Sequence, residues 1–222
     1  MPQLNCADDR AQRGSTVKSN AKRTQLAFLF APGAGAPSSS EWMQAFARQL
    51  SEIGSVECFD YAYQREGRRS PDRLPILMAA HQTAFERLRS EHAGPIVLIG
   101  KSMGGRIGCH LANHLGNNGP TALVCLGYPL VAPKGAVRDA VLMDLSTPIL
   151  FIQGTRDALC PPDRLVTVRK RMSAPNELHV VEGGDHSLRV PVRTLATQGR
   201  TQADVDAAIV HAVRDFVEPL IL

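Results

Sequence analysis

The chain has 222 residues, of which 44% are hydrophobic and 21% are charged, and its formal net charge is +4. These values are typical of a globular protein with a sizeable core. No apolar run is long enough to span a membrane, and no basic stripe with interleaved aromatic residues indicates a nucleic-acid partner. We therefore expect a soluble, cytoplasmic protein without a membrane span and without a nucleic-acid partner.

Five cysteines are present, at positions 6, 58, 109, 125 and 160, with no C-x-x-C pair. An odd number at irregular spacing is typical of reduced thiols in a cytoplasmic protein. Cys160 lies close to a candidate catalytic carboxylate but has no base of its own, so we expect it to be a bystander. The sequence predicts neither a metal site nor a cofactor.

Residues 1–24 are polar and unpatterned, which predicts a flexible N-terminal tail before a single domain over residues 25–222. The domain begins with an apolar run that predicts a buried strand, and such runs then alternate with amphipathic segments. The predicted strands lie at 26–30, 56–61, 96–99, 121–126, 148–153 and 178–181, and the predicted helices at 40–53, 75–92, 103–115, 162–172 and 202–217. Gly54 is expected to end the first helix, and the polar stretch 64–72 is expected to be a loop.

Near-continuous apolar strands that alternate with helices indicate an α/β fold. We expect about six mainly parallel strands with helices on both faces of the sheet. The short segment between Leu126 and Pro148 leaves no room for a cap domain. In such sheets ligands bind outside the carboxyl ends of the strands, so functional residues should directly follow strands.

The segment GKSMG, residues 100–104, has the pattern G-x-S-x-G and stands between a predicted strand and a predicted helix. This context is that of a nucleophile elbow, in which a sharp turn projects the serine hydroxyl above the sheet. The flanking glycines relieve the crowding that the turn creates, because they have no Cβ atom. Ser102 is therefore the candidate nucleophile.

A serine nucleophile needs a base to take its proton and an acid to orient that base. Asp157 follows the fifth predicted strand and His186 follows the sixth, which is the Ser–acid–His order of alpha/beta-hydrolases. Of the seven histidines, only His186 lies in a glycine-rich loop at a strand end. Asp185 and Asp144 are weaker alternatives for the acid, and Asp157 could instead cap the next helix or pair with Arg156.

The developing negative charge on the attacked carbonyl needs two backbone N–H donors. Met103 N–H is the first, at the start of a helix whose dipole favours an anion. The second is expected from the loop after the first strand, at Ala34. Gly33 and Tyr128 are candidate substrate contacts, as is Arg69 for a carboxylate or phosphate, although Tyr128 also fits a turn and Arg69 a solvated loop.

Several runs together resemble the small alpha/beta-hydrolase group that includes testis-expressed protein 30 and the NSL complex subunit 3 domain. They are FAPGAGAP, GRRSPDR, GKSMGGR, LVCLGYPL, TPILFIQGTRD and GGDHSL, within residues 25–217. The resemblance implies a lidless fold similar to dienelactone-hydrolase relatives, with the triad on Ser102, Asp157 and His186. The chain departs from that group at Pro32, where its members have histidine, although the backbone donors of the loop remain.

These observations predict a serine hydrolase that cleaves carboxylic esters or thioesters through an acyl-enzyme on Ser102. A small-molecule substrate is expected, and the sequence leaves the oligomeric state open. One alternative is an amide, peptide or acyl-carrier hydrolase with the same triad. The other is a binding or scaffold protein that keeps the fold without useful turnover.

Overall fold

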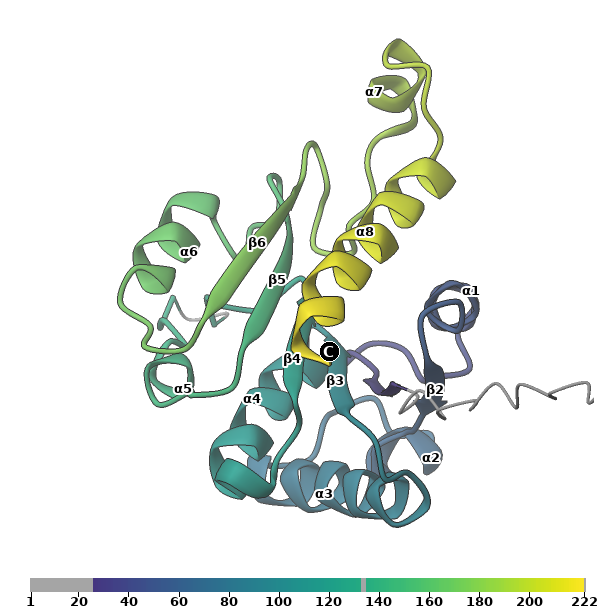
Figure 1. Ribbon diagram of the computed structural model, residues 1–222. Coiled ribbons are helices and arrows are strands. Elements are labelled where there is room, and N and C mark those ends of the chain that lie inside the picture. The colour runs from purple at the N-terminus through teal and green to yellow at the C-terminus, as the bar shows by residue number, and fades with distance from the viewer. Residues whose placement is uncertain (1–25, 133–134, 222) are drawn as a thin grey trace, which may run out of the picture.

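The computed structural model describes residues 26–132 and 135–221, and these form one six-stranded parallel sheet with the strand order β2-β1-β3-β4-β5-β6 (Figure 1). The strands are β1 (Ala27–Ala31), β2 (Ser55–Cys58), β3 (Ile96–Lys101), β4 (Ala122–Leu126), β5 (Ile149–Gly154) and β6 (Asn176–Val181). The helices are α1 (Glu41–Leu50), α2 (Ala62–Arg65), α3 (Leu74–Glu91), α4 (Met103–Leu115), α5 (Ala140–Met143), α6 (Pro162–Arg169), α7 (Val192–Thr197) and α8 (Gln202–Val217), with short 3-10 helices at Gly116–Asn118 and Glu218–Leu220. The predicted fold class is confirmed.

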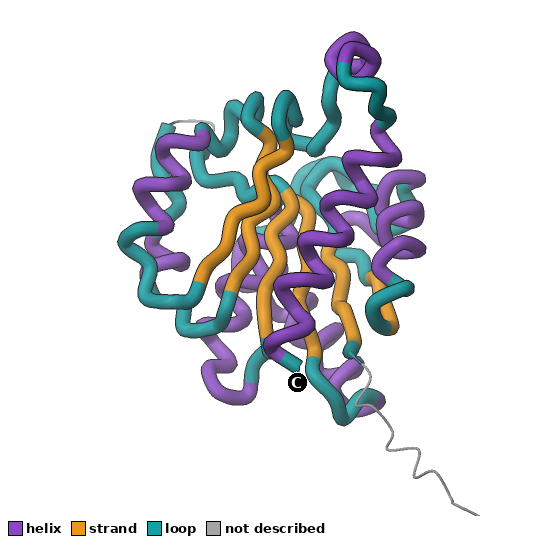
Figure 2. Tube along the Cα trace, turned by 45° about the horizontal axis from the view of Figure 1, so that its top comes forward, coloured by secondary structure: helices purple, strands orange, loops and turns teal. Residues whose placement is uncertain are grey.

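Two hydrophobic clusters cover the two faces of the sheet. One joins α3, α4, α5 and α6 to the sheet through residues such as Phe85, Ile107 and Leu165. The other joins α1, α7 and α8 to the opposite face through residues such as Phe46 and Ile209. Figure 2 shows α8 crossing one face of the strands while other helices lie behind them. Because both faces are covered, the four central strands β1, β3, β4 and β5 are buried along almost their whole length.

The helices predicted at 103–115 and 202–217 have the observed bounds of α4 and α8. A capping box starts α8, where the Thr201 side chain accepts from Asp204 N–H and the Asp204 side chain accepts from Thr201 N–H. The first helix was predicted too long, because α1 ends at Leu50. Gly54 does not cap it. A Cβ atom there would lie 2.4 Å from the Leu26 carbonyl oxygen, so the glycine allows close approach of β1 instead.

The stretch predicted as a loop from residue 64 is partly wrong, because α2 occupies Ala62–Arg65. The sequence analysis also did not predict α5 and α7. All three helices are one to two turns long, too short for a hydrophobic period to appear in the sequence. In the described part of the connection between β4 and β5, α5 is the one helix, which agrees with a fold without a cap.

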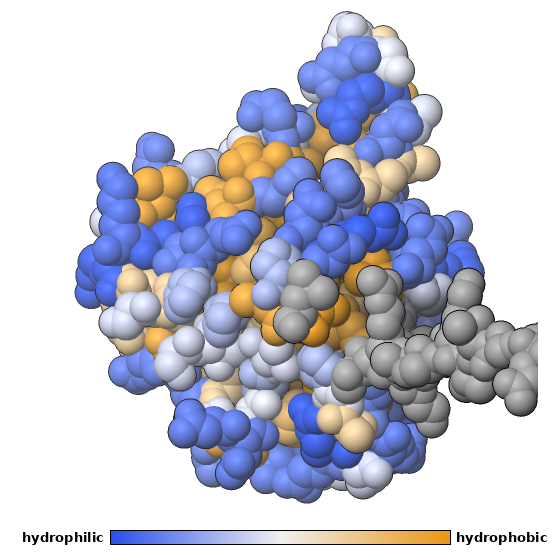
Figure 3. All heavy atoms as spheres, viewed as in Figure 1, coloured by the Kyte–Doolittle hydropathy of each residue, from blue (hydrophilic) through white to orange (hydrophobic). Residues whose placement is uncertain are grey.

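The helix α7 and the start of α8 project from the body of the molecule (Figures 1 and 2). Hydrophilic residues cover most of this projection in Figure 3. None of the helices in the described residues combines the length and the apolar character that crossing a bilayer requires. The predicted tail at residues 1–24 lies outside the described residues, so it and the single-domain boundary at residue 25 stay predictions.

Candidate functional site

Ser102 sits on a strained turn between β3 and α4. Its φ of 49° and ψ of −111° are rare for a residue with a side chain. A Cβ atom on Gly100 would lie 2.2 Å from Gly105 N, and one on Gly104 would lie 2.6 Å from the carbonyl oxygens of Ala31 and Pro32. Neither position tolerates a side chain, so the two glycines of G-x-S-x-G are required by the packing of the turn.

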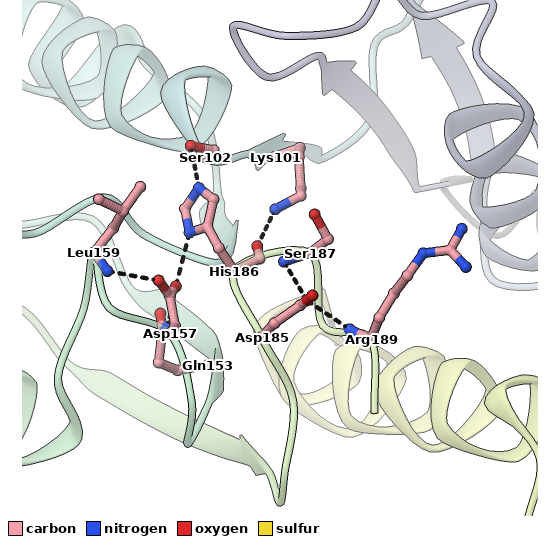
Figure 4. A network of polar contacts seen from close by, with 9 residues as sticks. All are labelled: Lys101, Ser102, Gln153, Asp157, Leu159, Asp185, His186, Ser187 and Arg189. Atoms are coloured by element: carbon pink, nitrogen blue, oxygen red, sulfur yellow. Dashed lines mark hydrogen bonds and ion pairs between the residues drawn. The ribbon is translucent and has the colours of Figure 1, made fainter. Parts of the chain in front are cut away.

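The structure brings Ser102, His186 and Asp157 together in one hydrogen-bonded chain (Figure 4). Ser102 Oγ lies 2.8 Å from His186 Nε2, and His186 Nδ1 lies 2.8 Å from Asp157 Oδ2. The His186 side chain is 29% exposed, whereas that of Asp157 is fully buried. The chain of contacts therefore runs from the molecular interior outward to the serine hydroxyl.

Asp157 is surrounded by donors that favour its charged form. Burial raises the pKa of this carboxyl group, but the hydrogen bond and charge of His186 and further hydrogen bonds outweigh it, so that the pKa lies below its ordinary value. The additional donors are Gln153 Nε2 at 2.6 Å and Leu159 N–H at 2.8 Å. A carboxylate held in this way can orient an imidazole and stabilise its cation.

Asp185 organises the loop that carries His186. Its Oδ1 accepts from Ser187 N–H at 2.7 Å and from Arg189 N–H at 3.0 Å (Figure 4). Leu188, the residue between them, has a φ of 61°, a second strained position close to the site. Asp185 is therefore committed to the backbone of its own loop.

Lys101 supports the same loop from β3. Its Nζ donates to the His186 carbonyl oxygen (Figure 4). Burial lowers the pKa of the Lys101 ammonium to about 8, although the charges of Asp157 and Asp185 act in the opposite direction. The His186 carbonyl also lies against Gly127, where a Cβ atom would be 2.7 Å from that oxygen and 3.3 Å from Lys101 Nζ.

The loop after β1 faces Ser102 and is tied from behind by α2. Tyr63 Oη donates to the Ala34 carbonyl at 3.0 Å, and Gln64 Nε2 donates to the carbonyls of Gly33 and Ala36 at 3.0 and 2.9 Å. These bonds engage carbonyl groups and leave the backbone N–H of Ala34 without an acceptor among the described residues. Side chains of α2 thus hold a loop that begins at Pro32.

A cavity of about 530 Å³ opens over Ser102, which is the size range of small-molecule sites. Its walls come from the loop after β1, the start of α1, the end of β3, the loop after β5 and the loop after β6. The lining residues are Gly33, Ala34, Gly35, Ala36, Ser40, Trp42, Met43, Lys101, Ser102, Leu159, His186, Ser187 and Arg189.

A family model described as "Alpha/beta hydrolase domain" matches residues 24–218. The chain belongs to this alpha/beta hydrolase family. Three solved structures share the fold. An alpha-beta serine hydrolase homologue from Coxiella burnetii is 17% identical, with a TM-score of 0.65, and the alignment covers 85% of each chain. Est1E from Butyrivibrio proteoclasticus is 16% identical, with a TM-score of 0.64 and coverage of 92% of this chain and 91% of that one.

A Xanthomonas campestris protein described as an a/b serine hydrolase without a lid is 18% identical to this alpha/beta hydrolase. Its TM-score is 0.65, and the alignment covers 86% of this chain and 83% of that chain. At these identities the likeness concerns the fold.

The structure does not bring every predicted residue to the cavity of this hydrolase domain. Gly33 lines it, but Tyr128 is fully buried, and its hydroxyl donates to the Arg138 carbonyl at 3.0 Å. Arg69 lies exposed in the loop between α2 and α3, away from the lining residues. Asp144 is exposed at the end of α5, before β5 begins. It therefore lies near the amino ends of the parallel strands, whereas His186 lies at their carboxyl ends.

Cys160 is fully buried, and burial together with the Asp157 charge raises its thiol pKa to about 12. A thiol with that pKa is not a nucleophile at neutral pH. Among residues 26–132 and 135–221, no group of three or more His, Cys, Asp or Glu side chains could hold a metal ion.

The sequence analysis missed Lys101 and Gln153 as parts of the site. Both are polar residues at the carboxyl end of an otherwise apolar strand, which is where α/β sheets place ligand-binding groups. That position at a strand end was the signal that could have identified them. The sequence holds no such signal for Trp42, Met43 and Arg189, because their approach to Ser102 depends on how α1 and the loop after β6 pack.

Proposed function

We propose that this chain is a serine hydrolase that cleaves carboxylic esters or thioesters. The proposal is carried by one observation, the continuous hydrogen-bonded chain from Ser102 through His186 to Asp157 beside an open cavity. We also propose that the chain is related to the narrower group that includes testis-expressed protein 30 and the NSL complex subunit 3 domain.

In the first half-reaction, Ser102 Oγ attacks the carbonyl carbon while His186 Nε2 takes the hydroxyl proton. The tetrahedral intermediate then collapses, and the bond to the alkoxide or thiolate leaving group breaks as His186 returns the proton to it. Water repeats the sequence on the acyl-enzyme, with His186 again acting as base, and the acid is released. Asp157 holds the imidazole in the reactive orientation and stabilises its cation.

Backbone groups would stabilise the negative charge on the tetrahedral intermediate. Met103 N–H opens α4, where the dipole favours an anion, and Ala34 N–H belongs to the loop tied by Tyr63 and Gln64. Both N–H groups are available for this role, since neither donates to a backbone carbonyl of the described residues.

A fluorophosphonate probe tests the nucleophile directly, because it forms a covalent bond with an activated serine. Wild-type protein should be labelled, and Ser102→Ala should not be. Ser187→Ala is the matched control, since Ser187 also lines the cavity but lies outside the hydrogen-bonded chain to Asp157. Equal labelling of wild type and Ser102→Ala would overturn the proposal.

Turnover of p-nitrophenyl acetate, acetyl-coenzyme A and an acetanilide then separates the bond classes. We expect the two activated acyl groups to be cleaved and the anilide to be cleaved far more slowly. Preference for the anilide would favour the amide alternative. Labelled protein without turnover of any substrate would favour a binding or scaffold role.

A further inference from the structure

The cavity over Ser102 has charges of one sign on its walls. Lys101 and Arg189 are its basic lining residues, and no Asp or Glu is among the lining residues. The two neighbouring carboxylates already accept hydrogen bonds from other groups of the protein. Asp157 is occupied by His186, Gln153 and Leu159 N–H, and Asp185 accepts from the backbone of its own loop. A ligand in this cavity therefore meets two basic side chains and no carboxylate among the lining residues.

The Lys101 ammonium can donate more hydrogen bonds than it makes to the described residues. An ammonium group carries three N–H bonds, and one of them is directed to the His186 carbonyl. Within the described residues Lys101 makes no ion pair with a carboxylate, and its pKa of about 8 keeps it mainly charged at neutral pH. An anionic ligand would supply the carboxylate or phosphate partner that this largely buried ammonium lacks among the described residues.

Arg189 presents a guanidinium on the same cavity. Its backbone N–H binds Asp185, whereas its side chain extends away from that carboxylate in Figure 4. No hydrogen bond or ion pair within the described part of the chain engages the guanidinium. Burial raises the pKa of Asp206 on α8, and Gln202 and Arg189 offset this only in part, but Asp206 does not line the cavity.

The cavity also has apolar lining residues, which suit the uncharged part of a ligand. They are Trp42 and Met43 of α1 and Leu159 of the loop after β5. Ser40 adds a hydroxyl to the lining, and this hydroxyl makes no capping hydrogen bond to α1. The cavity thus combines a nucleophile, an apolar wall and two cations within a volume that fits a small ester.

We propose that the substrates of this hydrolase are esters or thioesters that carry a second, anionic group, and that Arg189 and Lys101 form the subsite for that group. This inference rests on the proposed function, since it places the anion relative to a carbonyl held at Ser102. Two cations near a carboxylate or phosphate raise affinity by charge-assisted hydrogen bonds and by the local field.

Pairs of substrates that differ only in charge test the subsite. The p-nitrophenyl half-esters of succinate, adipate and suberate are compared with p-nitrophenyl butyrate, hexanoate and octanoate, after subtraction of spontaneous hydrolysis. These place the anion on the acyl side, whereas 4-acetoxybenzoate against 4-acetoxytoluene places it on the leaving group. For at least one pair we expect kcat/KM to favour the anion by about tenfold at low salt and less at high salt.

Arg189→Gln should remove most of that preference. Arg193→Gln is the matched control, because Arg193 is an exposed arginine on α7 outside the cavity. Equal preference ratios in the two variants, or no preference for any anionic substrate in wild type, would overturn the subsite. If neutral esters are still hydrolysed in a Ser102-dependent manner, the proposed function survives that result.

Binding can be followed without turnover, because Trp42 is the one tryptophan of the chain and lines the cavity. Monomethyl adipate added to Ser102→Ala should change the tryptophan fluorescence at lower concentration than methyl hexanoate does. The difference should shrink in Ser102→Ala/Arg189→Gln. An equal fluorescence response to both ligands would overturn the subsite. A charge-dependent response in Ser102→Ala, together with no esterase activity in the wild type, would instead contradict the proposed function alone.

Discussion

The loop after β3 and the loop after β6 each deliver one member of the Ser102–His186 pair, but they are held by different means. Ser102 is placed by steric constraints on the glycines of its own turn, because Gly100 has no room for a Cβ atom against Gly105, nor has Gly104 against the end of β1, and the serine itself has a positive φ. His186 is placed from far away in the sequence. Lys101 holds its carbonyl, and Asp157 holds its ring.

This difference explains why one loop appears as a sequence motif and the other does not. Local steric demands select particular residue types at fixed spacing, so they leave a pattern such as G-x-S-x-G. Distant contacts can be made by many residue types on several elements, so they leave only scattered polar residues at strand ends. Mutations should therefore affect the two loops through different quantities, namely stability at the elbow and turnover at the histidine loop.

The largest effect is expected from Asp157→Asn. The amide cannot favour the imidazolium and stabilises the wrong tautomer, so kcat should fall by about ten thousandfold with the fold retained. Turnover of p-nitrophenyl acetate and circular dichroism measure the two quantities. Asp185→Asn is the matched control, because this neighbouring carboxylate binds only backbone N–H groups in the structure. A larger loss in Asp185→Asn than in Asp157→Asn would reverse the assignment of the acid.

The next effect separates two glycines of one helix. At Gly104 a Cβ atom would lie 2.6 Å from two backbone carbonyls, so Gly104→Ala should lower the free energy of unfolding by about 3 kcal/mol and reduce activity. At Gly108 the nearest atom would be 3.7 Å away, in ordinary contact. Gly108→Ala should therefore raise the free energy of unfolding by about 0.5 kcal/mol, through better helix propensity.

Urea denaturation of both variants measures the contrast. Similar unfolding free energies in the two would show that the close packing around the elbow is not what fixes Ser102. The comparison also keeps the residue change constant, so propensity alone cannot explain a difference in sign.

Sequence reasoning succeeded where the physical cause was local or periodic. It predicted the bounds of α4 and α8 because a long amphipathic segment repeats its pattern several times. It selected Ser102, Asp157 and His186 because each follows a strand, and the structure brings these three side chains together. It failed at α2, which is four residues long, and thereby missed how Tyr63 and Gln64 tie the loop of Ala34. Arg69 and Tyr128 were also predicted to contact substrate, but Arg69 lies exposed between α2 and α3 and Tyr128 is buried, a difference set by packing.

The smallest effect is expected from Lys101→Met, which tests whether the histidine loop depends on its distant contact. With the neutral substrate p-nitrophenyl acetate, kcat should fall by about tenfold with little change in KM, because Lys101 acts through His186 and not on this substrate. Lys101→Arg should restore part of the rate. Lys170→Met is the control, because Lys170 is an exposed lysine directly after α6.

The pH dependence of the free energy of unfolding, measured on the same variant, reports whether the Lys101 ammonium is buried. The pKa of Lys101 is about 8 in the folded protein, against an ordinary value of 10.5. Between these two pH values the unfolded chain binds the proton that the folded chain has released, so wild-type stability should gain a rising contribution with pH in this window. Lys101→Met should lack that contribution while Lys170→Met keeps it. The same pH dependence of stability in wild type and Lys101→Met would show that the Lys101 ammonium is not buried beside His186. The loop of His186 would then be held by Asp185 and the backbone, and not by Lys101.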